Sequence, residues 1–377
     1  MAGIYLHIPF CKQACHYCDF HFSINLKKKK ALLEALKIEI GLRQQTWDAG
    51  PIETIYFGGG TPSLLNREEI NDLLVTIRTH FEITTGAEIT LETNPDDLSE
   101  SILSQWAEVG VNRLSIGVQS LEDNHLKLMN RAHNAKEAAT SIALAQAYFE
   151  NLSIDLIYGI PGMDDAQWKN TVEKVLAYNI PHISSYALTV EPKTALQKFI
   201  AKGVVPDVDD EQAQRQFNQL VAILTAHGFM HYELSNFGLP GYFSQNNTAY
   251  WQGKPYLGIG PSAHSFDGIQ RGWNIRNNSA YIKALEAGEV PITYETLSTT
   301  DRYNEYVMTG LRTIWGVSLL KVEQELGGSY AKYLKKQAQK YVDEHLLFWD
   351  DAVLLATKKG KFLVDGIASD LFMLNLR

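Results

Sequence analysis

Cysteine is scarce in this chain: it has three in 377 residues, all between positions 11 and 18. An odd, clustered set of thiols is a poor disulfide framework. No run of about 18 apolar residues occurs, so no transmembrane segment is expected, although peripheral contact with a membrane stays open. The first residues lack the basic start and long apolar core of a secretory signal. We therefore expect a cytoplasmic protein.

Positive charge is also in deficit, with 34 Lys and Arg residues against 43 Asp and Glu, a net charge of -9. A net acidic surface argues against generic binding of nucleic acid, so we expect no nucleic-acid partner. Hydrophobic residues make up 45% of the chain and charged residues 20%, which is ordinary for a globular protein. Long disorder, collagen and coiled coil are excluded.

The three cysteines, Cys11, Cys15 and Cys18, have the character of metal ligands. Three thiolates on a site with four positions leave one position open, as catalytic metals require. Zinc would need a fourth donor or a water, and several histidines lie close by in the sequence. A cubane iron–sulfur cluster normally takes four thiolates, so three would leave one iron free. Taken alone, these residues fit either a zinc site or an iron–sulfur cluster.

The first two thirds of the chain alternate between strand and helix patterns. Strands are predicted at 4–8, 54–57, 88–93, 113–118, 152–158 and 182–190, and helices at 67–81, 100–109, 135–149, 166–178 and 209–227. Caps are expected at Asn66 and Ser99, and Gly110 fits the end of a helix. Alternating apolar strands and helices favour a parallel α/β sheet. Six repeats predict an open, partial (β/α)6 barrel better than a closed barrel or a doubly wound sheet.

The composition changes after this barrel. Residues 236–300 are rich in Gly, Asn, Tyr and Pro and predict a loop-rich segment. From residue 301 the pattern is mostly helical, and residues 348–364 resemble a hairpin, which together suggest a winged-helix-like tail. We therefore predict a barrel at 1–235, a loop-rich segment at 236–300 and a C-terminal domain at 301–377. We expect the tail to cap the substrate side of the barrel.

Polar or glycine-rich segments lie at the ends of the first five predicted strands. They are the cysteine loop, Gly-Gly-Gly-Thr-Pro at 58–62, Glu-Thr-Asn-Pro at 92–95, Gly-Val-Gln-Ser at 117–120 and Tyr-Gly-Ile-Pro-Gly at 158–162. In parallel α/β folds these ends meet at one edge, where chemistry collects. The glycines permit unusual backbone angles and close approach of a ligand. Glu92 and Asp155 lie in apolar strands, so each needs a hydrogen-bonding partner.

With these motifs in place, the chain resembles the radical S-adenosylmethionine (SAM) family of oxygen-independent coproporphyrinogen III oxidases. The residues that carry the resemblance are the cysteine triplet with an aromatic before its last member, Tyr-Leu-His-Ile-Pro-Phe-Cys at 5–11, Phe-Gly-Gly-Gly-Thr-Pro at 57–62, Gly-Val-Gln at 117–119, Asp-Leu-Ile-Tyr-Gly at 155–159 and Tyr-Glu-Leu-Ser-Asn-Phe at 232–237. The resemblance covers nearly the whole chain and favours an iron–sulfur cluster over zinc.

The resemblance implies a role for each matching position. Cys11, Cys15 and Cys18 would hold a 4Fe-4S cluster with one open iron that binds SAM. Tyr5 and Tyr17 would pack around the cluster and SAM. The remaining SAM contacts would come from Gly59, Gly60, Thr61, Glu92, Gln119, Arg131, Asp155 and Ala187. Spacing alone does not place Arg131 near the others.

Within this family the chain looks most like HemW, the heme-chaperone branch. Its motif begins at residue 5, Asp19-Phe20 follows the last cysteine, and residues 246–251 resemble a His-Asn-x-x-Tyr-Trp motif linked to heme. Asn247, Tyr250 and Trp251 match that motif, but Asn246 stands at the histidine position, and an amide is a poor ligand for heme iron. His264 is the nearest alternative ligand in the sequence.

Two functions follow from this resemblance. The first is a chaperone that carries the cluster and SAM, binds heme and delivers it to an acceptor protein, with a separate electron donor. The second is a radical enzyme that oxidatively decarboxylates a porphyrinogen, coproporphyrinogen III.

Overall fold

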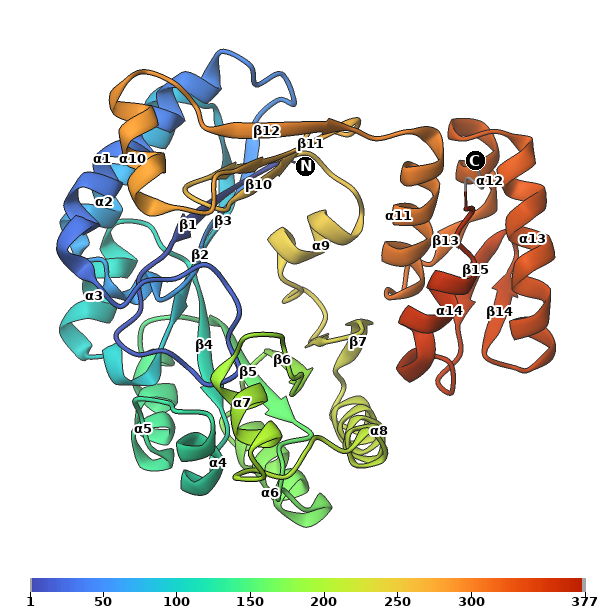
Figure 1. Cartoon of the computed structure of the whole chain (residues 1–377). Helices are drawn as coiled ribbons and strands as arrows, with labels where there is room; N and C mark the ends of the chain where they lie inside the picture. Colours follow the sequence, from blue (N-terminus) through green and yellow to red (C-terminus); the bar gives the residue numbers. More distant parts are fainter. Residues whose placement is uncertain (1, 375–377) are drawn as a thin grey trace.

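The computed structural model describes residues 2–374, and its main feature is a curved sheet of 12 strands (Figure 1). The strands follow the spatial order β12-β11-β10-β9-β1-β2-β3-β4-β5-β6-β8-β7. The six central strands are β1 (Gly3–Ile8), β2 (Ile52–Gly59), β3 (Ile83–Thr93), β4 (Arg113–Gln119), β5 (Asn151–Tyr158) and β6 (His182–Ala187). They pair in parallel, and each overlaps a predicted strand. The partial barrel is thus confirmed.

Helices cover the outer side of this sheet (Figure 1). They are α1 (Lys29–Gln44), α2 (Arg67–His80), α3 (Glu100–Glu108), α4 (Asp123–Leu128), α5 (Ala135–Ala145), α6 (Asp165–Leu176), α7 (Ala195–Ala201) and α8 (Asp210–Ala226). The Asn66 side chain accepts a hydrogen bond from the Glu69 amide at 2.9 Å, and Ser99 accepts one from the Ile102 amide at 3.4 Å. Both predicted caps are confirmed.

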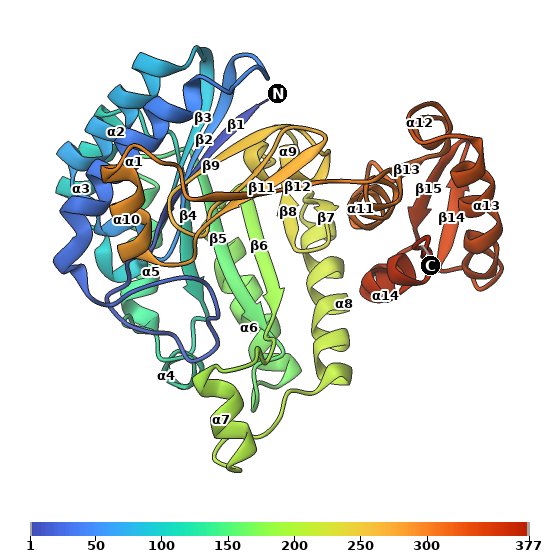
Figure 2. The ribbon, with the colours of Figure 1, turned by 45° about the horizontal axis from the view of Figure 1, so that its top comes forward.

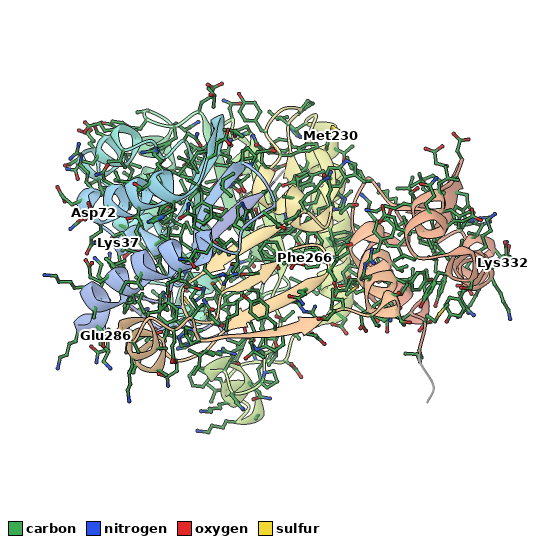
Figure 3. All side chains as sticks on the ribbon, turned by 90° about the horizontal axis from the view of Figure 1, so that it is seen from above. Lys37, Asp72, Met230, Phe266, Glu286 and Lys332 are labelled. Carbon is green, nitrogen blue, oxygen red and sulfur yellow. The ribbon has the colours of Figure 1, made fainter. Side chains whose placement is uncertain are left out.

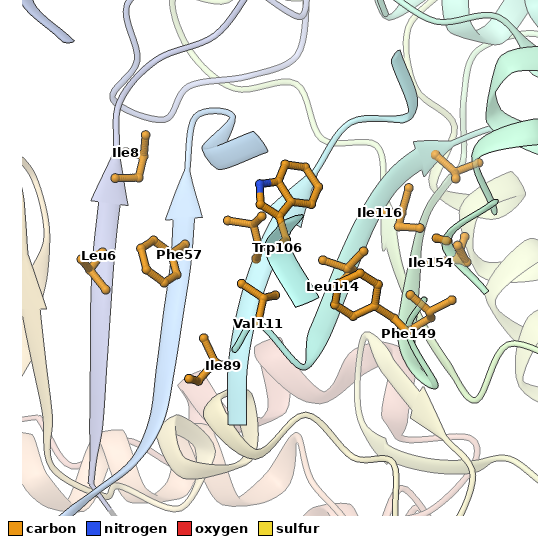
Figure 4. Packing of buried hydrophobic residues seen from close by; sticks show 14 of the residues in the cluster. Leu6, Ile8, Phe57, Ile89, Trp106, Val111, Leu114, Ile116, Phe149 and Ile154 are labelled. Carbon is orange, nitrogen blue, oxygen red and sulfur yellow. The ribbon is translucent and has the colours of Figure 1, made fainter. Parts of the chain in front are cut away.

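The core lies between the sheet and these helices. Apolar side chains from successive strands, including Leu6, Phe57, Leu114 and Ile154, are fully buried beside one another, with Trp106 of α3 packed over them (Figure 4). Each such side chain contributes about 1.5–3 kcal/mol to stability by leaving water. This layer fixes the strands rigidly, so the loops at their carboxyl ends are held in fixed relative positions.

Residues 236–300 widen the sheet rather than standing apart from it. The segment contains β8 (Asn236–Gly238), α9 (Gln245–Trp251), β9 (Tyr256–Ile259), β10 (His264–Phe266), β11 (Gln270–Asn274), α10 (Asn278–Glu286) and β12 (Ile292–Thr296), and β7 (Met230–Glu233) precedes it. β9 pairs in parallel with β1, and β10 to β12 follow it as antiparallel neighbours. The sequence did not reveal these strands, because they are short and lack clear alternation.

The C-terminal residues form a second hydrophobic cluster with its own three-stranded sheet (Figure 2). Its elements are α11 (Thr299–Leu311), β13 (Val317–Ser318), α12 (Leu319–Glu325), α13 (Gly328–Asp343), β14 (Leu347–Asp350), β15 (Val353–Ala356) and α14 (Val364–Asp370). The hairpin therefore ends at residue 356. The prediction that residues 358–364 complete it is wrong, because they turn into a short 3-10 helix and α14. The domain limits at 235 and 300 stay predictions.

No helix among residues 2–374 is both long and apolar enough to cross a membrane.

Candidate cofactor site

The loop that carries the three cysteines follows β1 and is held in place by its neighbours. The Cys11 amide donates to the Ser23 carbonyl at 3.1 Å, which closes the loop on itself. The Gln13 side chain donates to the Asn130 carbonyl at 2.7 Å, and the Asn130 side chain donates back to the Ala14 carbonyl at 2.8 Å. The segment that follows α4 thus fixes the loop over the carboxyl ends of the central strands.

The three cysteines line one cavity of about 150 Å³. All three are free thiols of intermediate exposure. The cavity is also lined by Tyr17, Gly59, Gly60, Thr61 and Arg131 from the predicted site, and by Lys12, Gln13, Phe20, Phe22, Asn94, Asp96, Asn130 and Ala132. The structure therefore brings eight of the residues singled out in the sequence around a single hollow.

The glycine run after β2 forms one wall of this cavity. Gly59 has a φ of +111°, a conformation that residues with a side chain rarely adopt. A Cβ atom on Gly60 would lie 2.6 Å from the Phe10 carbonyl oxygen. Only glycine lets the backbone of this turn come so close to the cysteine loop, as the sequence led us to expect.

Arg131 reaches the cavity from the segment after α4. Its Nη1 lies 3.4 Å from Cys15 Sγ, and its Nη2 donates to Asn94 Oδ1 at 2.6 Å and to the Gly117 carbonyl at 2.8 Å. Its Nε is buried and has no hydrogen-bond partner among the described residues. The guanidinium therefore places a fixed positive charge beside a thiol and keeps one donor free for a ligand.

Two half-buried carboxyl groups come from β3 and β5, and neither lines the cysteine cavity itself. Glu92 accepts hydrogen bonds from the Tyr56 hydroxyl at 2.9 Å and from the Gly59 amide at 3.1 Å. Asp155 accepts from the Ser115 hydroxyl at 3.0 Å. Burial raises the pKa of Glu92 to about 7 and that of Asp155 to about 6. Perturbed carboxyl groups next to a cavity are typical of binding sites for charged ligands.

Gln119 and Ala187 end β4 and β6 in different ways. Gln119 has a φ of +65°, and its side-chain nitrogen lies over Gly117, where an added Cβ atom would meet it at 2.9 Å. Gln119 and Arg131 therefore converge above the end of β4. Ala187 pairs in register with Tyr158, and it lies outside the cavities found among the described residues.

The residues of the cysteine cavity fit a 4Fe-4S cluster. Three thiols, a cation beside one of them and a glycine-rich wall provide ligands, charge compensation and room. Among residues 2–374, no three Cys, His, Asp or Glu side chains are gathered around one point as they would be for a single ion. Burial raises the pKa of Cys18 to about 11, so binding of metal must displace its proton. Once bound, such a cluster with SAM supplies one-electron chemistry.

A second cavity, of about 400 Å³, adjoins the first, and Phe20 lines both. Its other lining residues are Tyr5, His7, Asp19, His21, Tyr250, Tyr256, Ser262, Ala263, His264 and Arg276. Its volume lies within the range of about 300–1,000 Å³ that small-molecule sites occupy. Tyr5 therefore faces this second cavity rather than the cysteines, and we call it the aromatic cavity.

The residues expected to bind heme do not all reach the aromatic cavity. Tyr250 and His264 line it, whereas Asn247 and Trp251 do not. Asn246 is only 2% exposed, and its side-chain oxygen accepts from the Thr54 hydroxyl at 3.2 Å. Its side chain is thus committed to the core.

Helical geometry explains this division of the motif. Residues four apart lie on one face of a helix, so Asn246 and Tyr250 face the sheet while Asn247 and Trp251 lie on another face of α9. The Trp251 ring lies 5.0 Å from the Arg312 guanidinium, which comes from the end of α11. A 3.6-residue period applied to residues 245–251 could have revealed this.

Sequence reasoning missed several residues of the two cavities. His7, His21, Tyr256 and Arg276 line the aromatic cavity. His7 stands in the quoted motif and His21 lies near the cysteines, so both carried a signal. Tyr256 and Arg276 carried none, because the strands around them were not recognised.

Comparisons with known proteins agree with this geometry. Residues 5–175 match the Radical SAM superfamily, and residues 297–363 match the HemN C-terminal domain. Heme chaperone HemW from Lactococcus lactis is 34% identical over 374 residues, which cover 96% of this chain and 97% of that protein. Its counterpart from Bacillus subtilis is 33% identical over 96% of this chain.

Two further relatives extend the comparison. A bovine mitochondrial protein described as radical S-adenosyl methionine domain-containing protein 1 is 32% identical over 97% of this chain and 86% of its own length. The solved structure of coproporphyrinogen III oxidase (HemN) from Escherichia coli superposes with a TM-score of 0.85 at 25% identity, covering 99% of this chain and 90% of that one. With identity of about one third over nearly the full length of both chains, this chain belongs to the HemW family of the radical SAM superfamily.

Proposed function

We propose that this protein is a heme chaperone: it carries a 4Fe-4S cluster and SAM, binds heme in the aromatic cavity and passes it to an acceptor protein. The observation that carries the proposal is the aromatic cavity itself, which adjoins the cysteine cavity at Phe20. Tyr5, Tyr250 and Tyr256 offer flat apolar surfaces for a porphyrin. Arg276 offers a cation for a propionate.

His264 is the residue we propose as the iron ligand. Three histidines line the cavity, but His7 donates from Nε2 to the His21 carbonyl at 2.9 Å and accepts at Nδ1 from the Tyr5 hydroxyl at 3.2 Å. His21 donates from Nε2 to Asn278 at 2.6 Å. Among the described residues, neither ring nitrogen of His264 has a hydrogen-bond partner. An exposed imidazole with both nitrogens free suits axial ligation of heme.

The space around His264 also favours this assignment. His264 and Arg276 line a further hollow of about 600 Å³ on the side of β11. A macrocycle ligated by His264 would therefore have room to extend beyond the aromatic cavity. The buried Asn246, at the histidine position of the His-Asn-x-x-Tyr-Trp motif, has no part in this arrangement.

In the cysteine cavity we propose that Cys11, Cys15 and Cys18 hold the cluster and that Arg131, Gln119, Glu92 and Asp155 bind SAM. The free Nε of Arg131 offers a hydrogen bond to the SAM carboxylate, and the two carboxyl groups suit its cationic and hydroxyl groups. An electron donor would have to approach the exposed side of the cysteine loop, where Phe20 is 69% exposed.

The test is heme transfer by the reconstituted protein under anaerobic conditions. The protein with its cluster is loaded with heme, freed of excess and mixed with apomyoglobin, and the Soret spectrum is followed. We expect the protein to bind heme with the Soret spectrum of ligated iron. We then expect this heme to pass to apomyoglobin. His227 is an exposed histidine at the end of α8, so His227→Ala is the matched control for His264→Ala. Wild-type protein that takes up no heme contradicts the proposal.

A second candidate is oxidation of a porphyrinogen, favoured by the likeness of almost the whole chain to the Escherichia coli oxidase. The same two adjoining cavities would place a porphyrinogen next to SAM. An anaerobic assay with coproporphyrinogen III, SAM and a reductant separates the two functions. Formation of protoporphyrinogen together with 5′-deoxyadenosine supports the enzyme, and an intact cluster without product supports the chaperone.

A further inference from the structure

The structure has another cavity, of about 460 Å³, between the main sheet and the C-terminal elements. One side comes from β9 to β11 and the end of α9, with Tyr250, Tyr256 and Phe266. The other side comes from α11, α12 and the last described residues, with Tyr306, Leu326 and Phe372. Figure 3 shows Phe266 on the sheet and Lys332 on the far side of the C-terminal elements. We call this hollow the interdomain cavity.

The interdomain cavity is contiguous with the aromatic cavity. Tyr250 and Tyr256 line both, and their ring centroids lie 4.4 Å apart in an edge-to-face arrangement. The two rings thus form the partition between the cavities. A ligand in one cavity would contact one side of this pair while a ligand in the other contacts the opposite side.

The lining of the interdomain cavity combines aromatic rings with two cations that have no ion-pair partner among the described residues. Arg271 is committed to Glu295 at 2.9 Å and Glu305 at 2.7 Å. Arg302 has no side-chain partner among the described residues, and Lys321 lies 4.7 Å from the centre of the Tyr306 ring without an acid partner. Glu325 is the one lining carboxylate outside the Arg271 group.

Arg302 and Lys321 are thus the two lining cations that no carboxylate holds in an ion pair among the described residues, and five aromatic side chains lie beside them. Such a lining suits a flat, largely apolar ring system that carries carboxylates.

We propose that the interdomain cavity is a second tetrapyrrole site, in which the ring lies against Tyr250, Tyr256 and Phe266 and its carboxylates face Arg302 and Lys321. This proposal rests on the proposed function, because the second site would bind the same class of ligand as the aromatic cavity. It gives the C-terminal elements a role, since they supply half of the lining. A heme leaving the aromatic cavity would pass the tyrosine partition into a site that opens between the two parts of the chain.

A porphyrin without iron distinguishes the two sites, because His264 can ligate only the iron of heme. Protein preloaded with one coordinated heme is titrated with metal-free protoporphyrin IX, and binding is followed by porphyrin fluorescence. We expect one further porphyrin to bind. Arg302→Glu and Lys321→Glu should each weaken this binding about tenfold or more, since each replaces a charge-assisted contact by repulsion. Lys332→Glu, an exposed change of the same charge on the far side of α13, should leave it unchanged.

The outcomes are distinct. Preloaded protein that binds no porphyrin overturns the second site, as does equal affinity of Arg302→Glu, Lys321→Glu and Lys332→Glu. Coordinated heme binding that persists in Arg302→Glu while porphyrin binding weakens supports two separate sites. Absence of coordinated heme in every variant, with Arg302-dependent porphyrin binding retained, refutes the heme function of the aromatic cavity but not the second site.

Discussion

Arg312 contacts three parts of the molecule. Its replacement by Met should lower the free energy of unfolding by much more than the loss of its ion pair with the exposed Asp365 would. Its Nη2 donates to Glu233 Oε1 at 3.3 Å and its Nη1 to both oxygens of Asp365 at 2.6 and 2.7 Å, while its guanidinium lies 5.0 Å from the Trp251 ring. Glu233 lies in β7, Asp365 in α14 and Trp251 at the end of α9. One side chain therefore ties the sheet, the C-terminal elements and the α9 motif together.

The magnitude follows from the burial of the two carboxylates. The Glu233 side chain is 1% exposed and that of Asp365 is 52% exposed. Removing one member of a buried ion pair costs roughly 3–5 kcal/mol. Glu233 keeps hydrogen bonds from the Ser235 amide at 2.9 Å and the Asn236 side chain at 2.7 Å, which reduce that cost. Loss of the cation–π contact adds roughly 0.5–1 kcal/mol, so we expect a total of about 2–4 kcal/mol for Arg312→Met.

The assay is urea unfolding followed by tryptophan fluorescence and circular dichroism. Asp365→Asn is the matched control, because it removes only the exposed ion pair and should cost about 0–1 kcal/mol. Arg312→Lys should fall between them, since a single ammonium cannot serve both carboxylates as a fork does. Equal losses in Arg312→Met and Asp365→Asn would refute the reasoning, because the buried Glu233 would then gain nothing from its partner.

Further predictions concern the cysteine cavity. Cys15→Ala should abolish the cluster while leaving the fold intact, because the loop lies outside the core; iron analysis and circular dichroism check this, and iron at the wild-type ratio contradicts it. Gly60→Ala should reduce cluster incorporation severalfold, since its Cβ would lie 2.6 Å from the Phe10 carbonyl. Burial raises the pKa of Glu92 from 4.5 to about 7, so the folded apo chain binds a proton that the unfolded chain releases. Stability should therefore fall as pH rises from about 4.5 to 7, and Glu92→Gln should flatten that slope in urea unfolding; an unchanged slope contradicts the assignment.

The parts of the fold that the sequence predicted are those encoded locally. Strands β1, β2 and β5 are rich in apolar residues, and the cap at Asn66 depends on residues three apart. β9 to β12 are short, and although β10 to β12 pair within their own segment, the segment joins the sheet through β9, which pairs with β1 at the other end of the chain. No local pattern encodes such pairing. Residues 358–364 were predicted as part of the hairpin, but they form a turn and a 3-10 helix that lead into α14.

The same distinction holds for the site. Cys11, Gly59 and Glu92 come directly at or after central strands, so strand order alone gathers them at one edge. Arg131 comes from the segment after α4, whose return over Gly117 depends on contacts with the cysteine loop. The sequence singled out His264 only by its residue type. The structure adds that His7 and His21 are hydrogen-bonded, whereas the ring nitrogens of His264 have no partner among the described residues.

The central claim is that the aromatic cavity next to the cysteine cavity binds heme through His264. The most direct test is an anaerobic heme titration of the cluster-loaded wild type, His264→Ala and His227→Ala, followed at the Soret band. We expect saturable uptake of one coordinated heme in the wild type and in His227→Ala, and loss of the spectrum of coordinated heme in His264→Ala. An identical coordinated spectrum in all three proteins would contradict the assignment of the ligand, and no uptake by the wild type would contradict the heme function itself.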